Sequence, residues 1–179
     1  MSTASPTVTA TVTGAAVAWT DHANAKTSDN SHATSVLSTA NPASNPIRVT
    51  GFDFSAITEE VAIDGITVNV EGKTGGIGVT FLASAQLVLG GAVLGELDGT
   101  NKTLSAGDAT HVYGGGTTGW GANLTGAIVT DSTFGVQVVA GWTSGAGPTA
   151  SIDHIEIVVT WHSVAGIKRS RVSRNKRRR

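Results

Sequence analysis

Apolar side chains recur at every second position over several stretches of this chain, and a period of two is typical of half-buried β-strands. The alternation covers residues 8–12, 66–70, 77–89, 134–142 and 155–161. The Gly90–Gly91 pair follows one of these runs and predicts a tight hairpin turn, because glycine accepts the positive φ angles that such turns require. The sequence therefore predicts a sheet protein whose strands are joined by short turns.

Composition supports the same fold class and leaves little room for helices. Glycine is frequent at 23 residues, whereas aromatic residues make up 5% and charged residues 14% of the chain. A helical turn is expected only over residues 57–62, where Ser55 can cap the turn and Glu59 and Glu60 suit the positive end of its dipole. We predict an all-β fold, an antiparallel β-sandwich of jelly-roll type with about eight or nine strands and one short helical turn.

Length and local composition divide the chain into a body, residues 1–162, and a C-terminal arm, residues 163–179. Residues 74–95 carry no charge, but their six glycines and interleaved polar residues favour buried strands over a membrane span. The N-terminus has neither a basic start nor an apolar run, so no signal peptide is predicted. The absence of cysteine excludes disulfides and thiol chemistry.

Positive and negative charges are segregated along the sequence. The last twelve residues hold eight of the twelve Lys and Arg residues and no acid. Residues 1–167 keep four bases against thirteen acids, which gives them a formal charge of −9. Blocks of like charge repel themselves and commonly serve as interaction segments. We therefore expect the arm to bind an anionic partner.

Motifs for catalysis, metals or cofactors are weak. Gly114, Gly116 and Gly119 have the spacing of a dinucleotide fingerprint, but no helix is predicted to follow them. The five histidines lack metal-ligand spacing, and the acids of residues 98–108 depart from the calcium-loop pattern. Asp153 and His154 are adjacent in a predicted strand, so their side chains should point to opposite faces. We predict no enzymatic activity, no cofactor and no metal site.

The tryptophans have two expected roles. Trp142 and Trp161 fall on the apolar faces of their strands and are predicted to anchor the core. Trp120 lies in a glycine-rich loop near Tyr113. A contact of Tyr113 and Trp120 with another subunit or a ligand is the alternative to packing over the end of the sandwich.

Several short motifs occur in a familiar order along the body. They are Trp19, Asn24–Ala25, Asp29, Ala33, residues 52–55 (FDFS), Ile57, Ala62, residues 63–70 (IDGITVNV), Tyr113–Gly115, Trp120–Gly121, Leu124–Thr125, Phe134–Val136 and residues 152–161 (IDHIEIVVTW). This order resembles a family of β-sandwich domains in phage virion structural and tail-associated proteins. The resemblance covers roughly residues 15–161 and does not extend to the basic arm. It implies a non-enzymatic component of a virus particle.

The resemblance and the arm together suggest a function. The residues expected to bind a partner are Lys168, Arg169, Arg171, Arg174, Lys176, Arg177, Arg178 and Arg179. An acidic protein surface or a neighbouring copy is the favoured partner, nucleic acid is second, and a solubility tail is third. We expect an oligomeric virion protein, assembled in the host cytoplasm, that decorates the capsid. The alternatives are a small tail or tail-tip protein, a carbohydrate-binding adhesion module, and a shell protein whose arm binds the genome.

Overall fold

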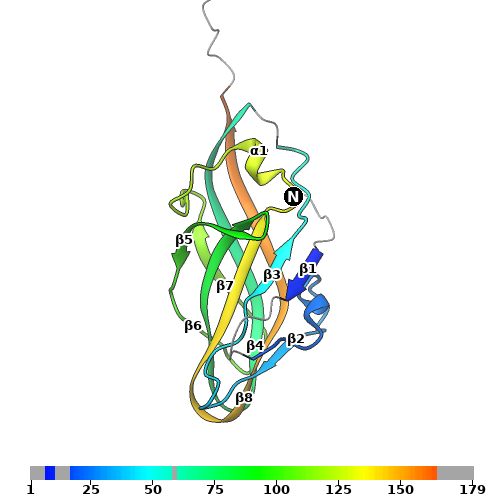
Figure 1. Cartoon of the computed structure of the whole chain (residues 1–179), viewed down its shortest axis with the longest axis vertical. Coiled ribbons are helices and arrows are strands. Elements are labelled where there is room, and N and C mark those ends of the chain that lie inside the picture. The colour runs from blue at the N-terminus through cyan, green and yellow to red at the C-terminus, as the bar shows by residue number, and fades with distance from the viewer. Residues whose placement is uncertain (1–6, 11–16, 58–59, 165–179) are drawn as a thin grey trace, which may run out of the picture.

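The structure is a computed structural model that describes residues 7–10, 17–57 and 60–164 (Figure 1). In chain order its elements are β1 (Thr7–Ala10), η1 (His22–Ala25), β2 (Ala33–Val36), β3 (Ile47–Thr50), β4 (Val61–Leu89), β5 (Ala92–Asp98), β6 (Lys102–Thr103), β7 (Ala109–Gly115), α1 (Gly126–Val129) and β8 (Gly135–Ser163). All pairings between these strands are antiparallel. The predicted all-β antiparallel sandwich is confirmed.

The fold is built around one long ribbon of two strands. β4 and β8 have 29 residues each and pair along nearly their whole length, from Val61 opposite Ser163 to Val88 opposite Gly135. Figure 1 shows both strands running to one tip of the molecule and reversing there, so the ribbon is folded over on itself. We call this tip, residues 75–78 and 145–147, the fold-over end. The opposite end, residues 61–64 and 160–163, is the arm end, because the arm follows it in the sequence.

Glycine makes the reversal possible. Gly78 and Gly145 face each other in the ribbon with φ angles of 149° and 104°, a region that other residues rarely adopt. A Cβ atom on Gly78 would overlap the carbonyl oxygen of Ser144, and one on Gly145 would overlap the carbonyl oxygen of Ile77. Two neighbouring strands can therefore bend together without a loop in either of them.

Folding the ribbon creates the two layers of the sandwich. In one layer, residues 61–75 of β4 and 149–163 of β8 are flanked by β7 and β2. In the other, residues 77–88 of β4 and 135–146 of β8 are flanked by β5 and β6 on one side and by β3, then β1, on the other.

The alternating apolar residues of both layers meet in a shared core. Its fully buried members include Ile66, Val68, Val70, Leu82, Leu87, Val136, Val138, Ile152 and Ile155. Burying one such side chain stabilises the fold by roughly 1.5–3 kcal/mol. The Tyr113 hydroxyl of one layer donates to the carbonyl oxygen of Leu82 in the other over 2.9 Å, which ties the layers together at one side.

Helical segments are the main departure from the sequence prediction. Val61 and Ala62, expected at the end of a helical turn, instead begin β4, while residues 58–59 of that turn lie outside the described residues. The helix α1 was not predicted; it begins after Thr125, whose Oγ1 accepts a hydrogen bond from the Ile128 N–H. The short η1 was not predicted either.

Two predicted boundaries can be compared with the structure. Gly90 and Gly91 connect β4 to β5 with φ angles of 58° and 80°, so the hairpin turn is confirmed. β8 continues to Ser163, one residue into the segment assigned to the arm. The arm residues 168–179 lie outside the described residues.

Candidate functional sites

A hollow of about 400 Å³ opens at the side of the sandwich, where the end of β5 meets the loop after β7. We call it the lateral hollow; its walls are Glu96, Leu97, Asp98, Gly99, Thr100, Thr118 and Trp120. Trp120 is only 4% exposed, and its indole N–H donates to the carbonyl oxygen of Ile66 over 2.9 Å. Tyr113 is 1% exposed. The two side chains pack over the side of the core and form no exposed aromatic pair, although Trp120 also lines the hollow.

Asp98 is one of the two acidic residues that line the lateral hollow. Its carboxylate accepts hydrogen bonds from the backbone N–H groups of Thr100 and Gly114, both at 3.1 Å. Burial alone would raise the pKa of Asp98, but these hydrogen bonds and the nearby Lys102 ammonium outweigh it, so the pKa is lowered overall. The Lys102 Nζ atom in turn lies 5.5 Å from the centre of the Tyr113 ring. The hollow therefore presents an ionised carboxylate and can accept hydrogen bonds.

The Tyr113 hydroxyl is unsuited to acid–base chemistry. Burial, with a smaller contribution from the Asp98 charge, raises the pKa of Tyr113 above its usual range. Its proton is committed to the Leu82 carbonyl oxygen. This tyrosine is a structural link between the layers.

A second group of polar side chains joins the segment before β2 to the loop before β7. The Asp108 carboxylate lies 2.9 Å from His32 Nε2 and 3.1 Å from Lys73 Nζ. Burial raises the pKa of Asp108, but the hydrogen bonds and charges of His32 and Lys73 outweigh it, so its pKa is lowered overall. Nearby, the buried Asp153 carboxylate accepts a 3.4 Å hydrogen bond from the Asp29 backbone N–H. These contacts fasten a long connection to the sandwich.

Metal binding has no obvious place in the part of the chain that the structure describes, where no three His, Asp or Glu side chains are grouped to hold an ion. His162 is paired with a single carboxylate, Asp64, at 2.7 Å. His111 is partly buried, and burial together with the Lys102 charge lowers its pKa, which favours the neutral ring.

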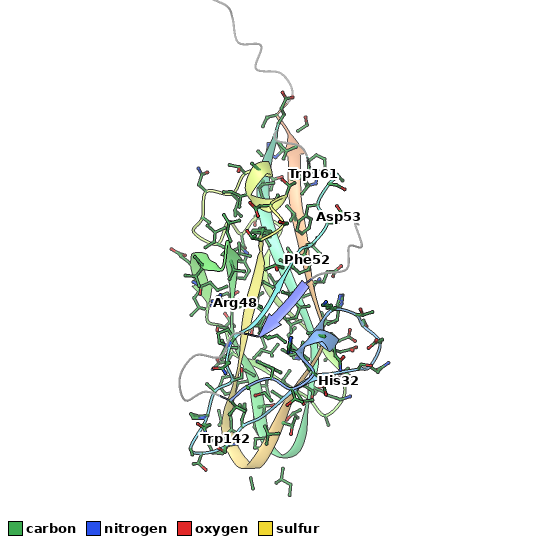
Figure 2. The ribbon with its side chains drawn as sticks, turned by 45° about the vertical axis from the view of Figure 1, so that its right-hand side comes forward. His32, Arg48, Phe52, Asp53, Trp142 and Trp161 are labelled. Atoms are coloured by element: carbon green, nitrogen blue, oxygen red, sulfur yellow. The ribbon has the colours of Figure 1, made fainter. Side chains whose placement is uncertain are left out.

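The arm end carries carboxylates beside an exposed aromatic ring. Trp161 is 41% exposed, so its prediction as a core anchor is wrong. Figure 2 shows Trp161 toward the same end as Asp53 and Phe52, far from Trp142 at the fold-over end. Trp142 is partly buried against the core, as predicted. Asp64 pairs with His162, and the carbonyl oxygen of exposed Glu60 accepts a hydrogen bond from the Val164 N–H.

The sequence favoured a loop over residues 98–108, but Asp98 is the last residue of β5 and residues 102–103 form β6. The contacts of Asp98 and Asp108 were not predicted. The lateral hollow was missed because its walls come from segments about twenty residues apart, residues 96–100 and 118–120. A hint was available in the clustering of Tyr113, Trp120 and glycine, which signalled a close packing of loop and sheet.

Comparison of the chain with models of protein families, with curated proteins and with solved structures gives no match in any of the three. Over the described ranges, no helix combines the length and apolar character that a membrane crossing requires.

Proposed function

We propose that this chain is a bacteriophage virion structural protein, a capsid decoration protein held on the particle by its basic C-terminal arm. The resemblance of its sequence motifs to virion β-sandwich domains supports the class. The observation that carries the proposal is the charge segregation: eight bases in residues 168–179 against a body with a formal charge of −9. Complementary charge of this kind steers association and selects partners.

Three of the four basic residues of the body are already engaged in contacts within it, which favours an acidic protein surface over nucleic acid as the partner of the arm. Arg48 donates to Gln137 and to the Gly91 carbonyl oxygen. Lys73 pairs with Asp108, and Lys102 lies over the Tyr113 ring. These three bases are occupied within the body, so they provide no basic patch to extend a nucleic-acid footprint from the arm.

Arginine dominates the arm, which suits binding to carboxylates. Its planar guanidinium makes two parallel hydrogen bonds to one carboxylate, a geometry that lysine lacks. The partner is an acidic face of another virion protein or of a neighbouring copy of this chain. A small tail or tail-tip protein is the nearest alternative, because the same arm would anchor it equally well. The adhesion module is less favoured, because Tyr113 and Trp120 are buried and offer no aromatic stacking platform.

The proposal is tested by incorporation into particles. Three versions of the chain are supplied to the assembling phage: one lacking residues 168–179, one with the eight arm bases replaced by Gln, and one with the arm sequence scrambled. The truncated and Gln versions should fold but be lost from purified virions, whereas the scrambled arm, which keeps its charge, should be retained. Normal incorporation of the Gln version would rule out the anchoring role.

Location on the particle separates the two virion alternatives. Heads and tails are separated, and the protein is quantified in each fraction by mass spectrometry. Recovery with heads supports capsid decoration, and recovery with tails supports the tail alternative.

A further inference from the structure

Polar groups at the fold-over end are buried without protein partners. Thr74 Oγ1, Thr80 Oγ1, Trp142 Nε1 and Ser35 Oγ each have no hydrogen-bond partner among the described residues. Thr80 is fully buried and Ser35 is 1% exposed. Leaving one such group unpaired costs about 1–3 kcal/mol, so native proteins rarely tolerate several of them.

Strand pairing and backbone hydrogen bonds make Thr74, Thr80 and Trp142 neighbours in the fold. Thr80 lies directly opposite Trp142 in the register of β4 and β8. Thr74 and Thr80 flank the fold-over in the same strand, and two consecutive residues link them: the Leu104 N–H donates to the Thr80 carbonyl oxygen, and the Thr74 N–H donates to the Ser105 carbonyl oxygen. Ser35 lies one strand further away, separated from Thr74 by Ala150.

The chemistry of the groups specifies what can satisfy them. An indole N–H only donates, so Trp142 needs an acceptor, whereas the two threonine hydroxyls can both donate and accept. A water molecule accepts from the indole and donates to the hydroxyl oxygens, and buried waters typically make about three such bonds. We propose that the fold-over end encloses a structural water site held by Thr74, Thr80 and Trp142. This site does not depend on the proposed function.

A water molecule at this site would connect the strands near the fold-over end through hydrogen bonds. Residues 74–95 and 132–152 carry no charge, so ion pairs between side chains of these segments are impossible. A bridging water replaces them as a polar connection between the two halves of β4 and the adjacent β8.

Matched variants of the full chain test the site by thermal unfolding. Thr80→Val keeps the side-chain shape but removes the hydroxyl, and Trp142→Phe removes the indole N–H. Each should lower the melting temperature by about 2–6 °C. The control is Thr160→Val on the exposed end of β8, which should leave the melting temperature nearly unchanged. The double variant should lose less than the sum of the two single variants, because they remove partners of the same water.

A crystal structure of the unaltered chain, at a resolution that shows ordered solvent, provides the independent check. The proposal predicts a water within hydrogen-bond distance of Trp142 Nε1 and at least one of the two threonine hydroxyls. A direct bond between Trp142 and Thr80, a dry interior, or a Thr80→Val variant as stable as the unaltered chain would overturn it.

Discussion

The two ends of the folded ribbon differ in how they are held together. At the fold-over end the backbone itself is the constraint: glycines at positive φ face each other, and buried polar groups replace charge. At the arm end Val61 still packs in the core, but Trp161 is exposed and the Asp64–His162 pair lies near the surface. One end is constrained by close backbone packing, whereas the other presents polar and aromatic side chains to solvent.

The two ends are therefore expected to differ in how much sequence change they tolerate. Close backbone packing tolerates few substitutions, whereas solvent-exposed charges can be exchanged with little effect on the fold. Partner binding is therefore expected to evolve at the arm end without loss of the body. The following predictions test that contrast.

The largest effect is expected from alanine at the fold-over. Gly145→Ala places a Cβ against the Ile77 carbonyl oxygen and the Gly78 Cα atom. It should lower the free energy of unfolding by about 3–5 kcal/mol. Gly147→Ala lies in the same bend but meets nothing within 4 Å, so its positive φ alone should cost about 1 kcal/mol. Urea titration measures both, and equal losses would contradict the close-approach argument.

Replacing the tryptophan at each end of the ribbon should have a smaller effect on stability than the glycine substitution. Trp142→Ala at the fold-over end removes a side chain packed against the core and should cost about 2–3 kcal/mol. Trp161→Ala at the arm end removes a ring that is 41% exposed and should cost below about 1 kcal/mol. The same urea titrations provide the numbers. A larger loss of unfolding free energy for Trp161→Ala than for Trp142→Ala would mean that Trp161 contributes more to core packing than its exposure indicates.

Charge pairing within the body should contribute least. Because the pKa of Asp108 is lowered in the fold, its stabilisation is present above the ordinary value of 3.8 and is lost as the pH falls through the folded pKa. Asp108→Asn should therefore cost below about 1 kcal/mol at pH 7. The difference from the unaltered chain should close below pH 3.8, as measured by unfolding at a series of pH values. A difference that persists unchanged at low pH would show that Asp108 does not act through its charge.

Period-two alternation was sufficient to predict the fold class, the apolar faces of residues 66–70, 134–142 and 155–159, and the Gly90–Gly91 turn. The apolar face predicted for residues 77–83 is wrong: Ile77 and Val79 are 79% and 41% exposed, whereas Thr80 and Leu82 are fully buried, and the pairing shifts register between Leu82 and Ser84. The alternation could not predict that β4 and β8 pair along their full length, because the period reports which face a residue occupies and not which strand lies beside it. The same limit applies to Trp161, because the period does not report whether a neighbouring element covers the side chain, which is 41% exposed.

The features that the sequence did not predict, α1 and the burial of Trp120, have separate causes. α1 is a single turn, too short for a helical period to appear, and only the Thr125 cap signalled it. Trp120 is buried because its backbone adopts a positive φ of 53° and its indole finds the Ile66 carbonyl oxygen, a distant partner that local composition does not reveal.

Electron cryomicroscopy of the assembled particle tests the central claim most directly, by tracing residues 168–179 in place. We expect arm density along a protein surface, with guanidinium groups beside Asp or Glu carboxylates of another virion protein or a neighbouring copy. Arm density lying against the packaged genome, or arms that contact no other molecule, would contradict it.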